Sequence, residues 1–233
     1  MNSTPLATAR RSRATAEPCE HPRNHLIARR RRIRTPAAGV FGAALLLATV
    51  GCGGGDSDSG PNLSAAPTQV RWQPFQGVAL PNAAQGPKKT GDGAATGFEH
   101  SPTGAALAAI VHTVRLSIAG DSQWPDIVRL EVVPDQARDE WSVNRLQLSI
   151  TGPAAPEYAP RLLGYKITSY TDAGSAVDVY TEYSDASKAV NHTTVEWFGN
   201  DWRLRLPDPE STARPIESVD ELPTDIVKLE APA

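Results

Sequence analysis

His100 is the first candidate for a functional residue, because it directly precedes a strong helix start. Ser101 is a good N-cap residue, and Pro102 suits the first helical position. A histidine at that place could face an anion bound at the helix N-terminus, or it could lock the loop by a hydrogen bond to the backbone. We favour the second interpretation and take His100 and Ser101 as a candidate loop and helix-cap site.

The other histidines and nearby acids do not form a catalytic or metal-binding pattern. Glu99, His100 and Ser101 are adjacent, and consecutive side chains in a turn do not point at one another as a nucleophile and its base must. His112 flanks the apolar side of a predicted helix, where we expect a half-buried spacer, and His192 lies on the polar face of a predicted strand. We therefore expect no metal site, no cofactor and no enzymatic activity.

Cys52 is the second candidate, and the chemistry it offers is acylation. An uncharged apolar segment of 14 residues, 37–50, follows a basic cluster that includes Arg29–Arg32. Such a segment is too short to span a bilayer, which takes about 20 residues, and the combination is typical of a secretory signal. Ala48–Cys52 resembles the bacterial lipobox, in which the cysteine thiol is diacylated and becomes the new N-terminus. The alternative is a buried structural cysteine, but the Gly-rich stretch after Cys52 is expected neither to pack nor to form a helix.

Two features of the export signal are left open by the sequence. The basic cluster is compatible with the general secretory route or with twin-arginine export. The run before the apolar segment is long for a signal, so translation could also start downstream, near Leu26.

Charge and composition divide the chain into unlike parts. Residues 1–51 hold nine Arg and two Glu, a net charge of +7, whereas residues 52–233 hold 14 basic and 24 acidic residues, a net charge of −10. The net negative charge of the second part disfavours binding to the phosphate backbone of nucleic acid. We expect a signal peptide at 1–51, a lipidated cysteine with a flexible linker at 52–69, one domain at 70–207 and an acidic tail at 208–233. The tail has four prolines and is expected to be mostly irregular, with a short helix near 219–222.

The first half of the domain predicts helices. After Ser101, apolar residues recur at helical spacing up to Gly120: Leu107, Ile110, Val111, Val114 and Ile118. We expect this to be the longest helix, with Leu107, Val111 and Val114 nearly fully buried. A second short helix is predicted over 124–132. Residues 137–150 fit a helix or a strand, and we favour the helix.

The second half predicts antiparallel strands, because apolar and polar residues alternate from Leu163 onward. Gly199–Asp201 and Asp172–Ser175 are predicted turns between strands. Residues 70–81 are expected to form an edge strand or a wrapping segment, with Arg71 and Trp72 as minor candidates for partner contact. The fold class is α+β, with helices followed by a strand meander, and a curved sheet on a long helix is similar to the NTF2-like cone.

The polar face of the predicted sheet carries charges that we expect to pair across strands. These residues are Asp178, Glu182, Glu196, Arg203 and Arg205. The inward positions of the strands are aliphatic or aromatic, and we expect no inward-facing acid there.

Three motifs resemble a known family. They are the Arg71–Pro81 segment with Gly86-Pro87 after it, the block Gly97–Ala105, and the late hairpin Val195–Leu204. They look like a family of uncharacterised actinobacterial domains, often encoded on conjugative elements. The resemblance implies a fold similar to the NTF2-like periplasmic domains of conjugative secretion systems.

Together these observations predict a non-enzymatic, lipid-anchored domain on the extracytoplasmic face of a bacterial cell membrane. Its expected partners are the membrane, through Cys52, and an unknown protein. A conjugative or secretion apparatus is the setting that we expect for this protein partner. The alternative from a different class is an NTF2-like module that binds a small ligand or acts as an enzyme at the membrane surface.

Overall fold

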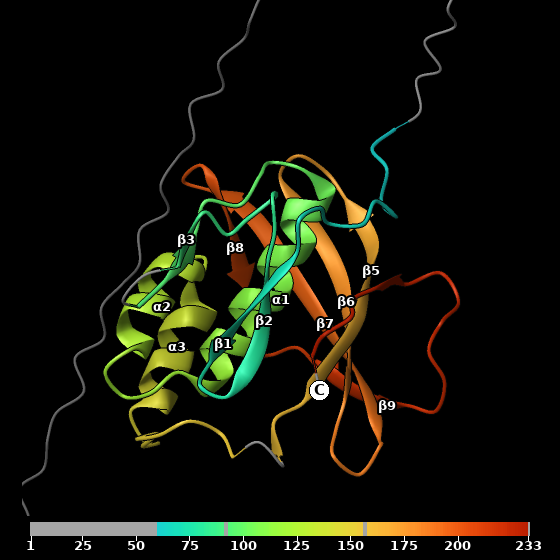
Figure 1. Cartoon of the computed structure of the whole chain (residues 1–233). Coiled ribbons are helices and arrows are strands. Elements are labelled where there is room, and N and C mark those ends of the chain that lie inside the picture. The colour runs from blue at the N-terminus through green and yellow to red at the C-terminus, as the bar shows by residue number, and fades with distance from the viewer. Residues whose placement is uncertain (1–59, 91–92, 156–157, 233) are drawn as a thin grey trace, which may run out of the picture. The chain divides into compact units, whose positions relative to one another are not determined.

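The structure, a computed structural model, describes residues 60–90, 93–155 and 158–232. The expected signal peptide and Cys52 lie outside these residues. Along the described chain two short hairpins come first, helices follow and the main sheet comes last (Figure 1). The elements are β1 (Arg71–Phe75), β2 (Val78–Asn82), β3 (Lys89–Thr90), β4 (Ala95–Thr96), α1 (Pro102–Ile118), α2 (Trp124–Glu131), α3 (Gln136–Arg145), β5 (Arg161–Tyr170), β6 (Gly174–Glu182), β7 (Lys188–Phe198), β8 (Asp201–Arg205), β9 (Ile216–Val219) and β10 (Val227–Lys228).

The main sheet is antiparallel and runs in the order β10-β5-β6-β7-β8, with β9 pairing along β7 beyond β8. Strands β5 to β8 form a meander in chain order, as the alternating pattern predicts. The α+β class, with helices ahead of the strand meander, is therefore confirmed. The cone shape stays a prediction.

Helix α1 starts where the sequence indicates. The Ser101 hydroxyl accepts a hydrogen bond from the Gly104 N–H at 3.2 Å, and Pro102 occupies the first helical position. Gly104 is needed there, because a Cβ atom would lie 2.0 Å from the Glu99 carbonyl oxygen. With 17 residues, α1 is the longest helix in the described part of the chain.

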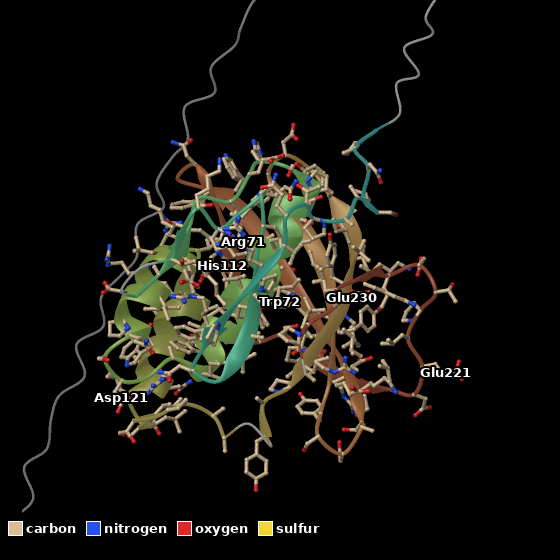
Figure 2. The ribbon with its side chains drawn as sticks, viewed as in Figure 1. Arg71, Trp72, His112, Asp121, Glu221 and Glu230 are labelled. Carbon is tan, nitrogen blue, oxygen red and sulfur yellow. The ribbon has the colours of Figure 1, made fainter. Side chains whose placement is uncertain are left out.

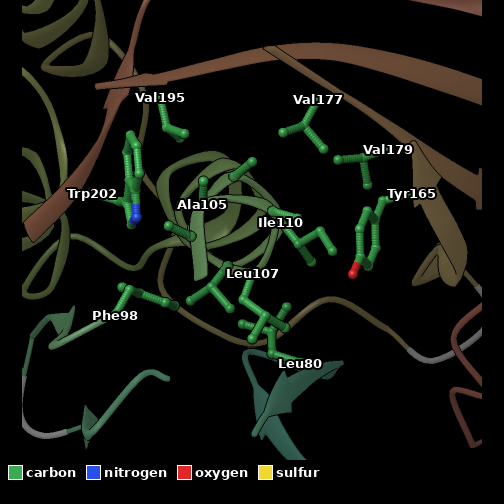
Figure 3. Close-up of a cluster of buried hydrophobic side chains, with 14 of the residues drawn as sticks. Leu80, Phe98, Ala105, Leu107, Ile110, Tyr165, Val177, Val179, Val195 and Trp202 are labelled. Atoms are coloured by element: carbon green, nitrogen blue, oxygen red, sulfur yellow. The ribbon is translucent and has the colours of Figure 1, made fainter. Parts of the chain in front are cut away.

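The main core forms around α1, which lies between the large sheet and the β1–β2 hairpin (Figures 1 and 3). Leu107 and Val111 are buried as predicted, and alanines on the same helix let the neighbouring layers approach closely. The expectation for Val114 is wrong, because this side chain lies at the margin of the packed face and is only half-buried.

Helix α3 is shorter than the predicted 137–150 segment. Asp135 caps its start by accepting from the Arg138 N–H, and the helix ends at Arg145. Beyond it, the Asp121 carboxylate accepts a hydrogen bond from the Ile150 N–H at 2.9 Å. That bond, with others from Ser149 and Arg145, holds the pKa of Asp121 below its ordinary value. Tertiary contacts thus take residues 146–150 out of the helix.

The acidic tail belongs to the folded domain rather than following it. Strand β9 pairs with β7, strand β10 pairs with β5, and Ile226, Val227 and Leu229 are buried. The expected domain end at residue 207 and the expected short helix near 219–222 are therefore wrong. The alternation of apolar and polar residues in the tail is too brief to indicate strands that depend on a partner edge.

Part of the predicted flexible linker also packs on the domain. The Ala65 carbonyl accepts hydrogen bonds from the Tyr165 hydroxyl at 3.1 Å and from the Thr103 hydroxyl at 3.2 Å. Burial raises the pKa of Tyr165 well above its ordinary value. Leu63 packs against the main core, so the fold begins ahead of residue 70.

Candidate functional site

The loop before α1 and the β7–β8 hairpin are tied together by side-chain hydrogen bonds. The Asp201 carboxylate accepts from the Gly97 N–H at 2.7 Å and from the Phe98 N–H at 3.0 Å. The Trp202 indole N–H donates to the Glu99 carbonyl at 2.9 Å. The Gly97–Ala105 and Val195–Leu204 motifs, far apart in the chain, therefore meet in one contact.

His100 lies on the outside of this contact. Its Nε2 donates to the Asp172 carbonyl at 2.6 Å, and its ring stacks on Trp197 with centroids 3.9 Å apart and planes 11° apart. The ring is exposed. His100 joins the loop to the β5–β6 turn, and Ser101 caps the helix that follows. This arrangement agrees with the loop-locking interpretation rather than with anion binding.

His112 takes part in a polar cluster inside the domain (Figure 2). Its side chain is only 1% exposed; Nδ1 lies 2.7 Å from Glu131 Oε2, and Nε2 lies 3.0 Å from the Trp202 carbonyl oxygen. The expected half-buried spacer is therefore wrong. Helix α2 and strand β8 close over the side of α1 that carries this residue.

Glu131 at the end of α2 is the centre of this cluster. It is fully buried, and its Oε1 accepts from the Ala95 N–H at 2.7 Å and from Arg115 Nε at 2.9 Å. Arg115 Nη2 also donates to the Gly93 carbonyl at 2.8 Å. We name His112, Arg115 and Glu131 the buried charge cluster. Its charges are hydrogen-bonded to one another, which is the condition for keeping them inside a domain.

Our sequence analysis missed Glu131 and Arg115, although one signal for Glu131 was present. Ile127 and Val128 precede Glu131 by four and three residues, so all three share one face of α2. An acid on the apolar face of a helix needs a buried cation or donor. No sequence feature indicates that the cation beside Glu131 comes from α1.

The polar face of the sheet carries most of the expected ion pairs. Glu196 pairs with Arg205, Glu182 pairs with Arg161, and Asp178 Oδ1 lies 2.7 Å from His192 Nδ1. Arg203 is different, because its guanidinium lies 5.1 Å from the centre of the Phe198 ring. These pairs are exposed or half-buried and are therefore worth little stability individually.

Arg71 and Trp72 belong to the β1–β2 hairpin that covers α1 (Figure 2). Trp72 is half-buried and packs against the main core, whereas Arg71 is exposed. The first motif therefore builds the layer over α1.

Two negative findings concern the described residues. Among their side chains, no group of three or more His, Cys, Asp or Glu is placed to hold a metal ion. In residues 60–90, 93–155 and 158–232, no helix combines the length and hydropathy needed to span a bilayer.

Comparison with known proteins assigns a family. Residues 35–224 match the model of a family described as a domain of unknown function, DUF8175, and the chain belongs to that family. No curated protein and no solved structure matches the chain.

Proposed function

We propose that this protein is a lipid-anchored, extracytoplasmic domain that binds a protein partner and does not catalyse a reaction. The observation that carries the proposal is the place of Cys52, two positions after the uncharged apolar segment 37–50 and shortly before a folded domain. Diacylation at this thiol would supply two acyl chains, and two chains suffice for stable anchoring.

The start of the fold limits how far the domain can be from such an anchor. Gly60 is the first described residue, and Leu63 already packs on the core. The chain from Cys52 to Gly60 spans at most about 30 Å when fully extended. An acylated Cys52 would thus keep the domain close to the membrane surface.

The histidines of the described domain support a binding role over catalysis. His112 is buried with both ring nitrogens in contact, His192 is paired with Asp178, and His100 is bonded to a backbone carbonyl. General acid–base catalysis needs such a group within reach of a substrate proton. Here each ring serves a contact inside the protein.

A candidate partner surface lies at the end of α3. Val143, Leu146 and Leu148 expose 62%, 71% and 63% of their surface. Leu146 is the C-cap of α3 and keeps helical backbone angles, so it lies next to Val143, three residues before it in the chain. Large apolar side chains exposed together favour a protein contact.

Lipidation is tested with Cys52→Ser in the full chain expressed in a bacterial host, with Cys19→Ser as the matched control. We expect the unaltered chain and the control to fractionate with membranes and to carry a diacylglyceryl mass on Cys52. We expect Cys52→Ser to give uncleaved precursor or soluble protein. An intact mass with an unmodified Cys52 in the membrane fraction contradicts the proposal.

Partner binding is tested by photo-crosslinking in cells, with the crosslinking residue at position 146 or, as control, at exposed Asp220. We expect a discrete adduct from position 146 that is lost when Val143 is changed to Glu. Equal crosslinking from both positions contradicts this surface.

The second candidate function is the binding of a small ligand. The observation that favours it is a cavity beside Arg115.

A further inference from the structure

A cavity of about 290 Å³ lies between α1, the β1–β2 hairpin and the short strands β3 and β4. Its walls include the apolar side chains of Phe75, Leu80 and Val111, and Arg115 and Gln123 add polar groups. This volume is close to the lower limit of the range of about 300–1,000 Å³ that is typical of small-molecule sites.

Arg115 is held rigidly at this cavity. Its side chain is 7% exposed, with Nε bonded to Glu131 and Nη2 bonded to the Gly93 carbonyl, and the Phe75 ring centre lies 4.2 Å from the guanidinium carbon. No acceptor among the described residues bonds to the remaining Nη1. A guanidinium fixed in this way presents its free edge without further loss of side-chain entropy.

The buried charge cluster carries a net charge of +1 if both contacts of the His112 ring are hydrogen bonds. Both ring nitrogens of His112 face acceptors only: the Glu131 carboxylate at Nδ1 and the Trp202 carbonyl at Nε2. A neutral imidazole has one N–H, so both contacts are hydrogen bonds only if His112 is cationic or if Glu131 is protonated and donates to Nδ1. With Arg115 cationic, either arrangement gives a net charge of +1.

Among the described residues beside Gly93, the Asp126 carboxylate is already paired with Arg129. None of the described residues that line the cavity is acidic. A buried net charge is costly unless a counter-charge lies beside it. The place open to a counter-ion is the cavity against which Arg115 lies.

We propose that this cavity binds a small organic carboxylate. The carboxylate accepts hydrogen bonds from Arg115, and a tail of a few carbons fills the space along Phe75, Leu80 and Val111. Gln123 provides a second donor, since its Oε1 already accepts from Gln76 and from the Gly120 N–H and its NH₂ group remains. This site does not depend on the proposed partner contact at α3.

The proposal is tested by calorimetric titration of the full-length chain, in a non-ionic detergent, with butyrate, the uncharged butyramide and inorganic phosphate. We expect saturable binding of butyrate with a dissociation constant of about 1 mM or lower, at least about tenfold tighter than that of butyramide. Equal binding of butyrate and butyramide, tighter binding of phosphate, or no binding of butyrate overturns the proposal.

A charge variant at the cavity wall separates binding from folding. Gln73 is exposed and lines the cavity, so Gln73→Glu places a competing carboxylate there without touching the buried charge cluster. We expect butyrate to bind at least about tenfold more weakly to Gln73→Glu and nearly unchanged to Gln73→Met. Equal affinities of the two variants overturn the proposal. Arg115→Met should also abolish binding, but it removes one of the three partners of the buried Glu131 carboxylate and is not a sufficient test alone.

Two further measurements address the charge itself. In the ¹⁵N spectrum of histidine-labelled protein, His112 should carry protons on both nitrogens or on Nε2 alone; a proton on Nδ1 alone leaves no net charge and overturns the proposal. Asp92 lies outside the described residues. If Asp92→Asn binds butyrate and the unaltered chain does not, the chain supplies its own counter-charge and the proposal fails.

Discussion

At the scale of single residues, the Glu131 carboxylate connects three elements. It accepts from Ala95 of β4 and from Arg115 of α1, its Oε2 lies 2.7 Å from His112 Nδ1, and its own backbone ends α2. Each donor is buried, so the carboxylate neutralises a cation and satisfies a backbone N–H where water does not reach. One side chain thereby fixes the relative positions of α1, α2 and β4.

Glu131→Gln should therefore be strongly destabilising. The amide keeps the size of the side chain but removes the charge that Arg115 and His112 require, and breaking a buried pair costs about 3–5 kcal/mol. The free energy of unfolding, measured by urea denaturation, should fall by that amount. Glu140→Gln, at an exposed position on α3, is the control and should change it little. Equal stabilities of the two variants would show that the buried carboxylate is not needed.

At the scale of elements, α1 holds the layers together because it contacts both the hairpin and the sheet. Its alanines, Leu107 and Ile110 face the two sides, and Figure 3 shows them between Val177, Val179 and Val195 of the sheet and Leu80 and Phe98 opposite. A helix that is covered on both sides has no broad polar face toward water. This explains why alanine, which fits close contacts, is frequent here.

The loss in free energy of unfolding caused by truncating a side chain of α1 should depend on how completely that side chain is buried. Leu107→Ala leaves a cavity in a fully buried site and should cost about 2–5 kcal/mol. Val114→Ala, at a half-buried position, should cost only about 1 kcal/mol. Chemical denaturation of the two variants checks this order. A Val114→Ala cost equal to that of Leu107→Ala would contradict the packing described for α1.

The segment between β9 and β10 is fastened by an ion pair whose effect depends on pH. Asp225 Oδ2 lies 2.7 Å from Lys166 Nζ; the Lys166 hydrogen bond lowers the pKa of Asp225, and the same bond raises the pKa of Lys166. The Asp225 contribution is present above its unfolded pKa and is lost as pH falls through the lowered folded value. The Lys166 contribution is present below its unfolded pKa and is lost as pH rises through the raised folded value.

Asp225→Asn should consequently destabilise this segment most between about pH 4 and about pH 10, and the effect should fade as pH falls below or rises above that window. Both groups are exposed, so the effect should be small and should decrease with added salt. Hydrogen exchange of the β10 amides, compared between the variant and the unaltered chain, measures it. A difference that persists undiminished at about pH 2 would rule out the ion pair as its cause.

At the scale of the whole domain, the two ends of the described chain complete the core. Leu63 packs on it from the N-terminal side, and β10 extends the sheet beside β5 at the C-terminal side. The acidic tail also covers Tyr180 and Val190 on the other face of the sheet with Ile226. The region after residue 207 is therefore part of the cooperative unit.

A chain ending at residue 207 should not fold cooperatively. It lacks Ile226, Val227 and Leu229, and burying each such side chain contributes about 1.5–3 kcal/mol. Their sum is comparable with the whole stability of a typical domain, about 5–15 kcal/mol. Thermal unfolding followed by circular dichroism should show no sharp transition, whereas a chain ending at Glu230, which keeps β10, should retain one. A sharp transition for the shorter chain would contradict the role of the tail.

Local patterns in the sequence determined the class of fold and the start of α1. The Ser101–Pro102 cap, the helical spacing of Leu107 and Val111, and the alternation in β6 to β8 each depend on neighbours in the chain, and the structure follows them. The candidate residue His100 stacks on Trp197 of β7 and bonds to the Asp172 carbonyl, and Ser101 caps α1. Such features are readable because hydrogen bonds and side-chain periodicity within one element involve residues only a few positions apart.

Only the tertiary structure decided which distant residues meet. Asp201 bonds to the backbone of Gly97 and Phe98, which lie about a hundred positions earlier in the chain. Glu131 of α2 contacts Ala95 of β4 and both His112 and Arg115 of α1. The tail strands likewise depend on edges that β5 and β7 provide. Packing between elements decides which charge is buried, where α3 ends and where the domain ends. The periodicity of one segment does not indicate which surface will cover that segment, so these features could not be predicted from it.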